Sequence, residues 1–188
     1  MRTFQEIAKD PRYWHETALG LHRSAKVLER EIMTQLEKLA QNPIKGGTVV
    51  STATVPGLQM TRGFFLLAAF SMENLLKGIL VVREPQLVHQ TKLDRALCTH
   101  NLLSLSQRAK FSLDQLDSFF LYLASEQASW AGKYHTPKTS DTLGVTVFGP
   151  GYFDAYDRLY GLFCGELEKH LDGRVVYQVI GDLKKAPT

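Results

Sequence analysis

The sequence predicts an all-α fold: an up-and-down bundle of four or five helices with small β strands at its periphery. Apolar residues recur at spacings of three and four over most of the chain, which is the period of an α-helix. Helix-start and helix-stop residues flank these stretches, and segments rich in glycine, proline and β-branched residues separate them. We therefore expect one domain over residues 1–188, with a core over 11–171 and a strand-like tail over 174–188.

The first long helix is predicted to begin at Asp10-Pro11 and to end before Asn42-Pro43, because Asp10 can cap it and proline suits the first helical position. Its apolar stripe is Trp14, Ala18, Leu21, Ala25, Leu28, Ile32, Leu36 and Leu39. This near-heptad stripe indicates a long antiparallel partner helix in the same domain. A coiled-coil dimer ranks second, because the stripe holds two alanines and spans only about four heptads.

The second helix is predicted over residues 60–83, after a loop or strand pair over 43–59. It ends before Glu84-Pro85, because the residue ahead of a proline disfavours the helical region. A connector over 84–98 leads to a third helix, which Thr99 would cap so that His100 opens it. Ser112 and Gln115 then form a capping-box pattern for a fourth helix, which runs towards residue 130.

The fourth helix would carry Leu116, Phe119, Phe120, Leu123, Ala124 and Gln127 towards Trp130. A non-helical segment over 133–150 includes a strand-like stretch at 143–149. The last helix is predicted over about 152–171, with a stripe of Phe153, Tyr156, Tyr160, Phe163 and Leu167. The apolar run at 174–180 is strand-like and could pair with one of the loop strands.

Composition limits the function classes. A chain of 188 residues that is 44% hydrophobic and 22% charged is typical of one globular domain rather than a disordered chain. The net charge of +3 permits a phosphate-bearing partner without requiring one. Cys98 and Cys164 form no metal pattern, and the N-terminal residues lack a signal-peptide core. We expect reduced thiols in a cytoplasmic protein.

No membrane span, metal or cofactor is expected from the motifs. The apolar stretch 64–82 is long enough to cross a membrane, but Glu73, Asn74 and Lys77 at its centre make a span costly. Histidine pairs at helical ligand spacing and a phosphate-binding glycine loop are both missing from the sequence.

Glu73 and Lys77 lie on the apolar stripe of the second helix, four residues apart. A buried carboxylate needs a partner, because burying it alone costs several kcal/mol. The simpler interpretation is a Glu73–Lys77 pair within the helix. The sharper one is that Glu73 also holds a functional group on another element. Its candidates are His100 and the segment with Lys133 and Tyr134, which are otherwise structural or solvated residues.

Three short motifs follow one another within residues 60–140. In the first motif, a small residue, a glutamate and a lysine follow one another at intervals of four residues. The second motif is a histidine followed by leucines. The third is a basic residue, a tyrosine and a proline. The matching residues are Ala69, Glu73 and Lys77; His100 with 102–105; and Lys133, Tyr134 and Pro137. Together they resemble the HEPN family of helical domains (higher eukaryote and prokaryote nucleotide-binding). The last motif departs from the family's usual Arg-Tyr-Pro, because two residues separate its tyrosine and proline.

The resemblance implies a nucleotide or RNA-type ligand, a homodimer and a bacterial stress or defence setting. Many family members resemble metal-independent ribonucleases marked by an arginine four to six residues before a histidine. Such a histidine can move the proton of a ribose 2′-hydroxyl, and the arginine can hold the phosphate. The spacing occurs at Arg83–His89 and at Arg95–His100, and the second suits the chemistry better because His100 is expected to open a helix.

We therefore expect a non-catalytic binding site of Glu73, Lys77, Lys133 and Tyr134 around His100. One alternative is a metal-independent ribonuclease with His100 as acid and base and Arg95 as phosphate clamp. The other is a protein-interaction or structural module in which the same residues form a buried network. The first two require the side chains of Glu73 and His100 to meet.

Overall fold

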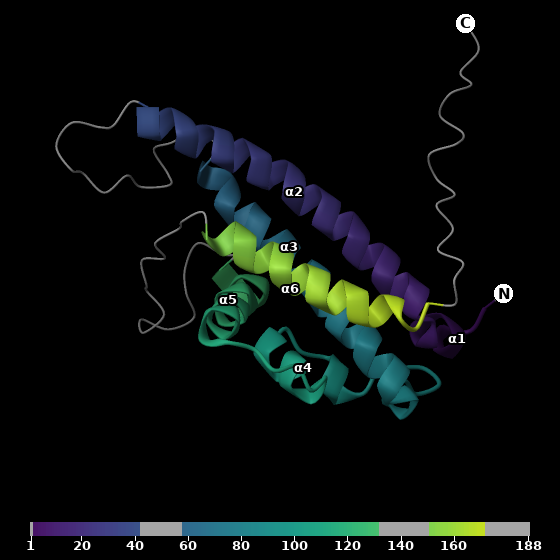
Figure 1. Cartoon of the computed structure of the whole chain (residues 1–188). Coiled ribbons are helices and arrows are strands. Elements are labelled where there is room, and N and C mark those ends of the chain that lie inside the picture. Colours follow the sequence, from purple (N-terminus) through teal and green to yellow (C-terminus); the bar gives the residue numbers. More distant parts are fainter. Residues whose placement is uncertain (1, 42–57, 132–150, 172–188) are drawn as a thin grey trace, which may run out of the picture.

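The computed structural model describes residues 2–41, 58–131 and 151–171 (Figure 1). Within these ranges the chain is α-helical and contains no β-sheet; its strand-type pairing is one isolated bridge between Val88 and Leu93. The all-α prediction is therefore confirmed for this part of the chain. The strand-like stretches predicted at 143–149 and 174–180 lie outside the described residues.

The chain begins with a short helix that the periodicity did not predict, α1 (Phe4–Lys9). Thr3 caps it in a capping box with Glu6, each side chain bonding the other residue's backbone N–H. Asp10 then separates α1 from α2 (Pro11–Gln41), and its Oδ1 accepts from the backbone N–H of Arg12 at 3.1 Å. The predicted cap and start of the first long helix are confirmed.

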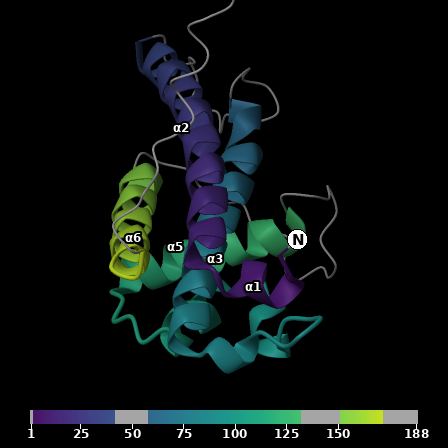
Figure 2. The same cartoon turned by 90° about the vertical axis from the view of Figure 1, so that its right-hand side faces the viewer.

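The central helix is α3 (Thr61–Arg83), which is buried along most of its length. A 3-10 turn at Leu58–Met60 leads into it. Figures 1 and 2 show α2 running alongside α3 in the opposite direction, and these two helices pack most extensively against each other. The antiparallel partner expected for the first long helix is therefore α3. The side of α3 that α2 leaves free is covered by α6 (Gly151–Glu168), α4 (Leu102–Arg108) and α5 (Gln115–Glu126).

The connector after α3 holds two 3-10 turns, Pro85–Leu87 and Arg95–Leu97, and leads to α4 (Leu102–Arg108). The predicted start of α4 is wrong by two residues. Asn101 caps it, because its side-chain oxygen accepts from Ser104 N at 2.9 Å, whereas Thr99 Oγ1 bonds only Asn101 N. His100 therefore lies just before the helix rather than at its first turn.

The fourth predicted helix is α5 (Gln115–Glu126), which continues into a π-helical turn, Gln127–Ala131. Its cap is Asp114, whose Oδ1 accepts from Asp117 N at 2.7 Å, and not Ser112 as predicted. Of the apolar residues named for this helix, Leu116 and Phe119 are exposed. The helix is turned so that its buried hydrophobic residues are Phe120, Leu121 and Ala124.

The core lies where α3 meets α2 and α6. All five residues of the predicted α6 stripe are buried, and Phe64 of α3 makes edge-to-face contacts with Phe153 and Tyr156. In the described part of the chain, α3 is the one helix long and apolar enough to span a membrane, and 67% of its most apolar window is buried inside the fold.

Candidate functional site

Glu73 and Lys77 form a buried ion pair on α3. Lys77 Nζ donates to Glu73 Oε1 at 2.6 Å, and the two side chains are 11% and 8% exposed, respectively. The i, i+4 spacing places them one turn apart on the same face. The pair predicted within the helix is therefore present, in a setting too buried for it to be an ordinary surface salt bridge.

The second oxygen of Glu73 leaves the helix and contacts His100, as the sharper interpretation required. His100 Nδ1 lies 2.8 Å from Glu73 Oε2, and the ring edge packs near Phe70 with ring centroids 5.7 Å apart. The His100 side chain is 44% exposed, whereas Glu73 is buried. The carboxylate therefore ties a half-exposed imidazole to the central helix.

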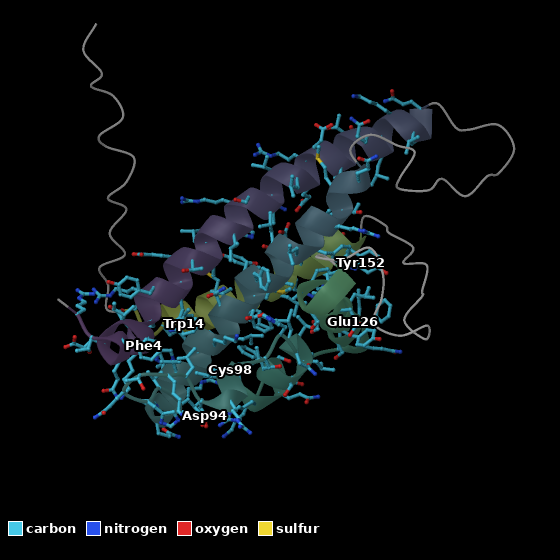
Figure 3. All side chains as sticks on the ribbon, turned by 180° about the vertical axis from the view of Figure 1, so that it is seen from behind. Phe4, Trp14, Asp94, Cys98, Glu126 and Tyr152 are labelled. Atoms are coloured by element: carbon cyan, nitrogen blue, oxygen red, sulfur yellow. The ribbon has the colours of Figure 1, made fainter. Side chains whose placement is uncertain are left out.

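The backbone around His100 is fixed from two sides. Asn101 caps α4, and Leu102 N donates to Ser125 Oγ of α5 at 2.9 Å. In Figure 3 the labelled Asp94 and Cys98 mark the connector that leads to this point. The imidazole is thus held by its own backbone and by Glu73.

This geometry determines what the imidazole can do. With the carboxylate of Glu73 as acceptor, Nδ1 carries a proton and Nε2 keeps its lone pair. Nε2 makes no hydrogen bond with any other described residue. A neutral His100 can therefore accept a proton from a hydroxyl, and a protonated one can donate to a phosphate oxygen.

Among the described residues, no hydrogen bond or ion pair joins Arg95 to His100. Arg95 lies in the 3-10 turn of the connector, is exposed, and makes no hydrogen bond or ion pair within the described ranges. The other pair with the ribonuclease spacing is occupied elsewhere. Arg83 binds Glu166 at 2.5 Å and the Ala109 carbonyl, and His89 lies 3.4 Å from Asp94.

Lys133 and Tyr134 lie outside the described residues, so their part in the site stays a prediction. Two surface hollows in the described part of the fold are lined by other groups. One, of about 570 Å³, is lined by Arg83, Glu84, Arg108 and Lys110. The other, of about 520 Å³, lies between the ends of α1, α3 and α6. His100 lines neither of these two hollows.

A second polar cluster, which the sequence did not predict, lies where α2, α3 and α6 meet. Tyr156 Oη lies 2.9 Å from both Ser71 Oγ and His22 Nδ1. The His22 ring stacks on Tyr160 with centroids 3.7 Å apart. Burial raises the pKa of Tyr156 and of Tyr160 well above the ordinary phenol value, so both stay protonated. Tyr156 is the one of the two whose hydroxyl joins the described hydrogen bonds.

The same burial makes this cluster sensitive to acid. Burial lowers the pKa of His22 below its ordinary value of 6.5. As the pH falls, His22 is therefore protonated in the unfolded chain before it is protonated in the folded one. The stability that neutral, buried His22 contributes is present above about pH 6.5 and is lost as the pH falls below that value. We expect urea unfolding of His22→Phe to show a shallower loss of stability than wild type between about pH 7 and pH 5. Phenylalanine keeps the stack on Tyr160, and parallel curves would contradict the prediction.

Among the described residues, one group has donor atoms close enough together to hold a metal ion: His15, Cys164 and Glu168. Burial raises the pKa of the Cys164 thiol to about 11, so it is not an activated nucleophile. The sequence expectation of no metal site rested on local spacing, whereas His15 and Cys164 are 149 residues apart.

No protein-family model, curated protein or solved structure matches this chain. The resemblance to HEPN domains therefore depends on the three motifs alone.

Proposed function

We propose that this chain is a HEPN-like helical domain that binds an RNA-type or nucleotide ligand, with His100 as the residue that contacts it. The hydrogen bond between Glu73 and His100 carries the proposal, because it joins two of the motif residues across two elements. We also propose that the helices of this domain form an up-and-down bundle with small β strands at its periphery. The bacterial stress or defence setting comes from the resemblance alone.

Charge and exposure favour a phosphate-bearing ligand. A protonated His100 presents an N–H donor at the surface, and the exposed Arg95 lies five residues earlier in the same connector. Lys133 and Tyr134 would complete the surface. Because the His100 side chain is 44% exposed, an extended RNA strand suits the site better than an enclosed nucleotide.

The proposal predicts salt-dependent RNA retention that needs His100. A charge-assisted hydrogen bond contributes about 1.5–3 kcal/mol, so His100→Ala should weaken binding of a mixed single-stranded RNA about tenfold or more. The matched control is His89→Ala, because His89 is equally exposed and also faces a carboxylate. Fluorescence anisotropy at several salt concentrations measures the effect. Equal losses in both variants would contradict the proposal.

A second function is favoured by the carboxylate-oriented imidazole itself. In a metal-independent ribonuclease, His100 would take the proton of a ribose 2′-hydroxyl as its oxygen attacks the adjacent phosphorus. The bond to the 5′-oxygen of the next nucleotide breaks, that oxygen takes up a proton from the now protonated His100 and leaves as a 5′-hydroxyl, and a 2′,3′-cyclic phosphate remains. Running the binding assay in EDTA and separating the RNA by length distinguishes the two functions. Fragments from wild type but not from His100→Ala support cleavage, and intact RNA supports binding alone.

The structural-module alternative makes the opposite prediction in the same assay. If Glu73, Lys77 and His100 only hold the fold together, wild type retains RNA weakly. Their variants then change the melting temperature and leave this weak RNA retention unchanged. The homodimer and the cytoplasmic location stay predictions from sequence.

A further inference from the structure

We propose that His15, Cys164 and Glu168 form a binding site for a zinc-type divalent transition metal between α2 and α6. His15 Nε2 lies 3.3 Å from Glu168 Oε1 and 3.5 Å from Cys164 Sγ. Cys164 Sγ lies 3.4 Å from the same Glu168 oxygen. The three ligand atoms therefore form a closed triangle. This site is separate from the one around His100 and does not depend on the proposed function.

The triangle differs from a nucleophilic triad. In a triad, the thiol and the carboxylate bind opposite nitrogens of the imidazole. Here both approach Nε2 of His15. Hydrogen bonding cannot satisfy all three sides either, because the thiol and Nε2 supply at most one proton each. A single cation at the centre would satisfy all three atoms together.

The dimensions fit zinc. Zinc bonds are about 2.3 Å long to sulfur, about 2.05 Å to imidazole nitrogen and about 2.0 Å to oxygen. At tetrahedral angles, these lengths place nitrogen and oxygen about 3.3 Å apart, and place sulfur about 3.5 Å from each of them. The observed separations of 3.3, 3.5 and 3.4 Å agree with these values. One thiolate and one imidazole select zinc, cobalt or copper over magnesium or calcium.

The site is supported by the fold and open to solvent on one side. Cys164 and Glu168 lie one turn apart on α6, and His15 is buried on the second turn of α2. The Glu168 side chain is 52% exposed, which leaves a coordination position for water. Three protein ligands plus one open position are the pattern of exchangeable or catalytic zinc sites.

Cobalt titration tests the proposal, because Co²⁺ replaces zinc and its spectrum reports the ligands. Metal-free full-length chain should bind one Co²⁺ with a thiolate-to-metal charge-transfer band, and Zn²⁺ should displace it. Cys164→Ser should abolish that band, and Glu168→Gln should weaken binding about tenfold or more. Cys98→Ser is the matched control, because this exposed cysteine lies elsewhere and its loss should leave the spectrum unchanged.

The variants must be shown to fold before they are compared. Glu168 is half exposed, so Glu168→Gln should melt like wild type without metal, and Zn²⁺ should raise the melting temperature of wild type more than that of Glu168→Gln. A charge-transfer band that survives Cys164→Ser, or one that Cys98→Ser removes, would overturn the site. So would equal metal affinity in wild type and Glu168→Gln.

Discussion

Replacing Glu73 by alanine is expected to lower the free energy of unfolding by about 3 kcal/mol, because it leaves the buried Lys77 without its partner. The ammonium of Lys77 is 2.6 Å from the lost carboxylate, and its side chain is only 11% exposed. His100 loses its hydrogen bond at the same time. Urea unfolding measures the change as a lower midpoint at an unchanged slope.

A surface ion pair provides the control. Lys169 pairs with Glu166 at 2.6 Å over i, i+3, but the lysine side chain is 69% exposed. Lys169→Met should therefore change stability by less than about 1 kcal/mol. If Glu73→Ala and Lys169→Met cost the same, the Glu73–Lys77 pair would be no more than a solvated salt bridge.

The double variant Glu73→Leu/Lys77→Met separates stability from function. Replacing a buried ion pair by apolar side chains of similar size is often neutral or stabilising, so we expect stability within about 1 kcal/mol of wild type. Such a protein is folded, yet its His100 has no carboxylate to orient it. RNA retention should fall as in His100→Ala. Full retention would show that Glu73 has a structural role only.

The long helices could be predicted because each carries a strong periodic stripe and a local stop signal. Asp10-Pro11 and Glu84-Pro85 fix the beginning of α2 and the end of α3 through backbone sterics, which need no tertiary information. The six residues of α1 are too few for periodicity, although the Thr3–Glu6 capping box was a usable signal. The predicted start of α4 was wrong because either Thr99 or Asn101 could cap the helix by residue type. Only the folded geometry shows that Asn101 is the cap.

The candidate site was also predictable only in part from the sequence. Glu73 could be found because a charge on an apolar stripe demands a partner, and His100 was one of few groups able to supply it. Arg95 is predicted from its spacing to His100 and from the helix expected there, and its role as a phosphate clamp stays a prediction. The clusters around His22 and His15 join α2 to α6 across 134 and 149 residues. Of these contacts between α2 and α6, the sequence shows a local pattern only for Cys164 and Glu168, which are four residues apart.

Gly78→Ala is expected to destabilise the protein by about 1–2 kcal/mol, although alanine is the better helix former. A Cβ at residue 78 would lie 2.9 Å from Trp14 Cβ and 3.0 Å from a methyl of Leu167. The Leu167 methyl can rotate away, but Trp14 Cβ is attached to the backbone of α2. Its indole is also held, because Trp14 Nε1 donates to the Ala8 carbonyl at 2.9 Å. The added methyl must therefore separate α2 from α3.

Gly161→Ala and Gly165→Ala give the matched comparison, since both glycines lie in α6 and a Cβ there meets nothing within 4 Å. Each should gain up to about 1 kcal/mol from helix propensity alone. The sign of the change thus reports contact and not helix preference. Because α2 and α3 pack over most of their length, thermal unfolding should show the loss as a lower midpoint of one cooperative transition. A Gly78→Ala protein as stable as Gly161→Ala would mean that α2 approaches α3 less closely than described.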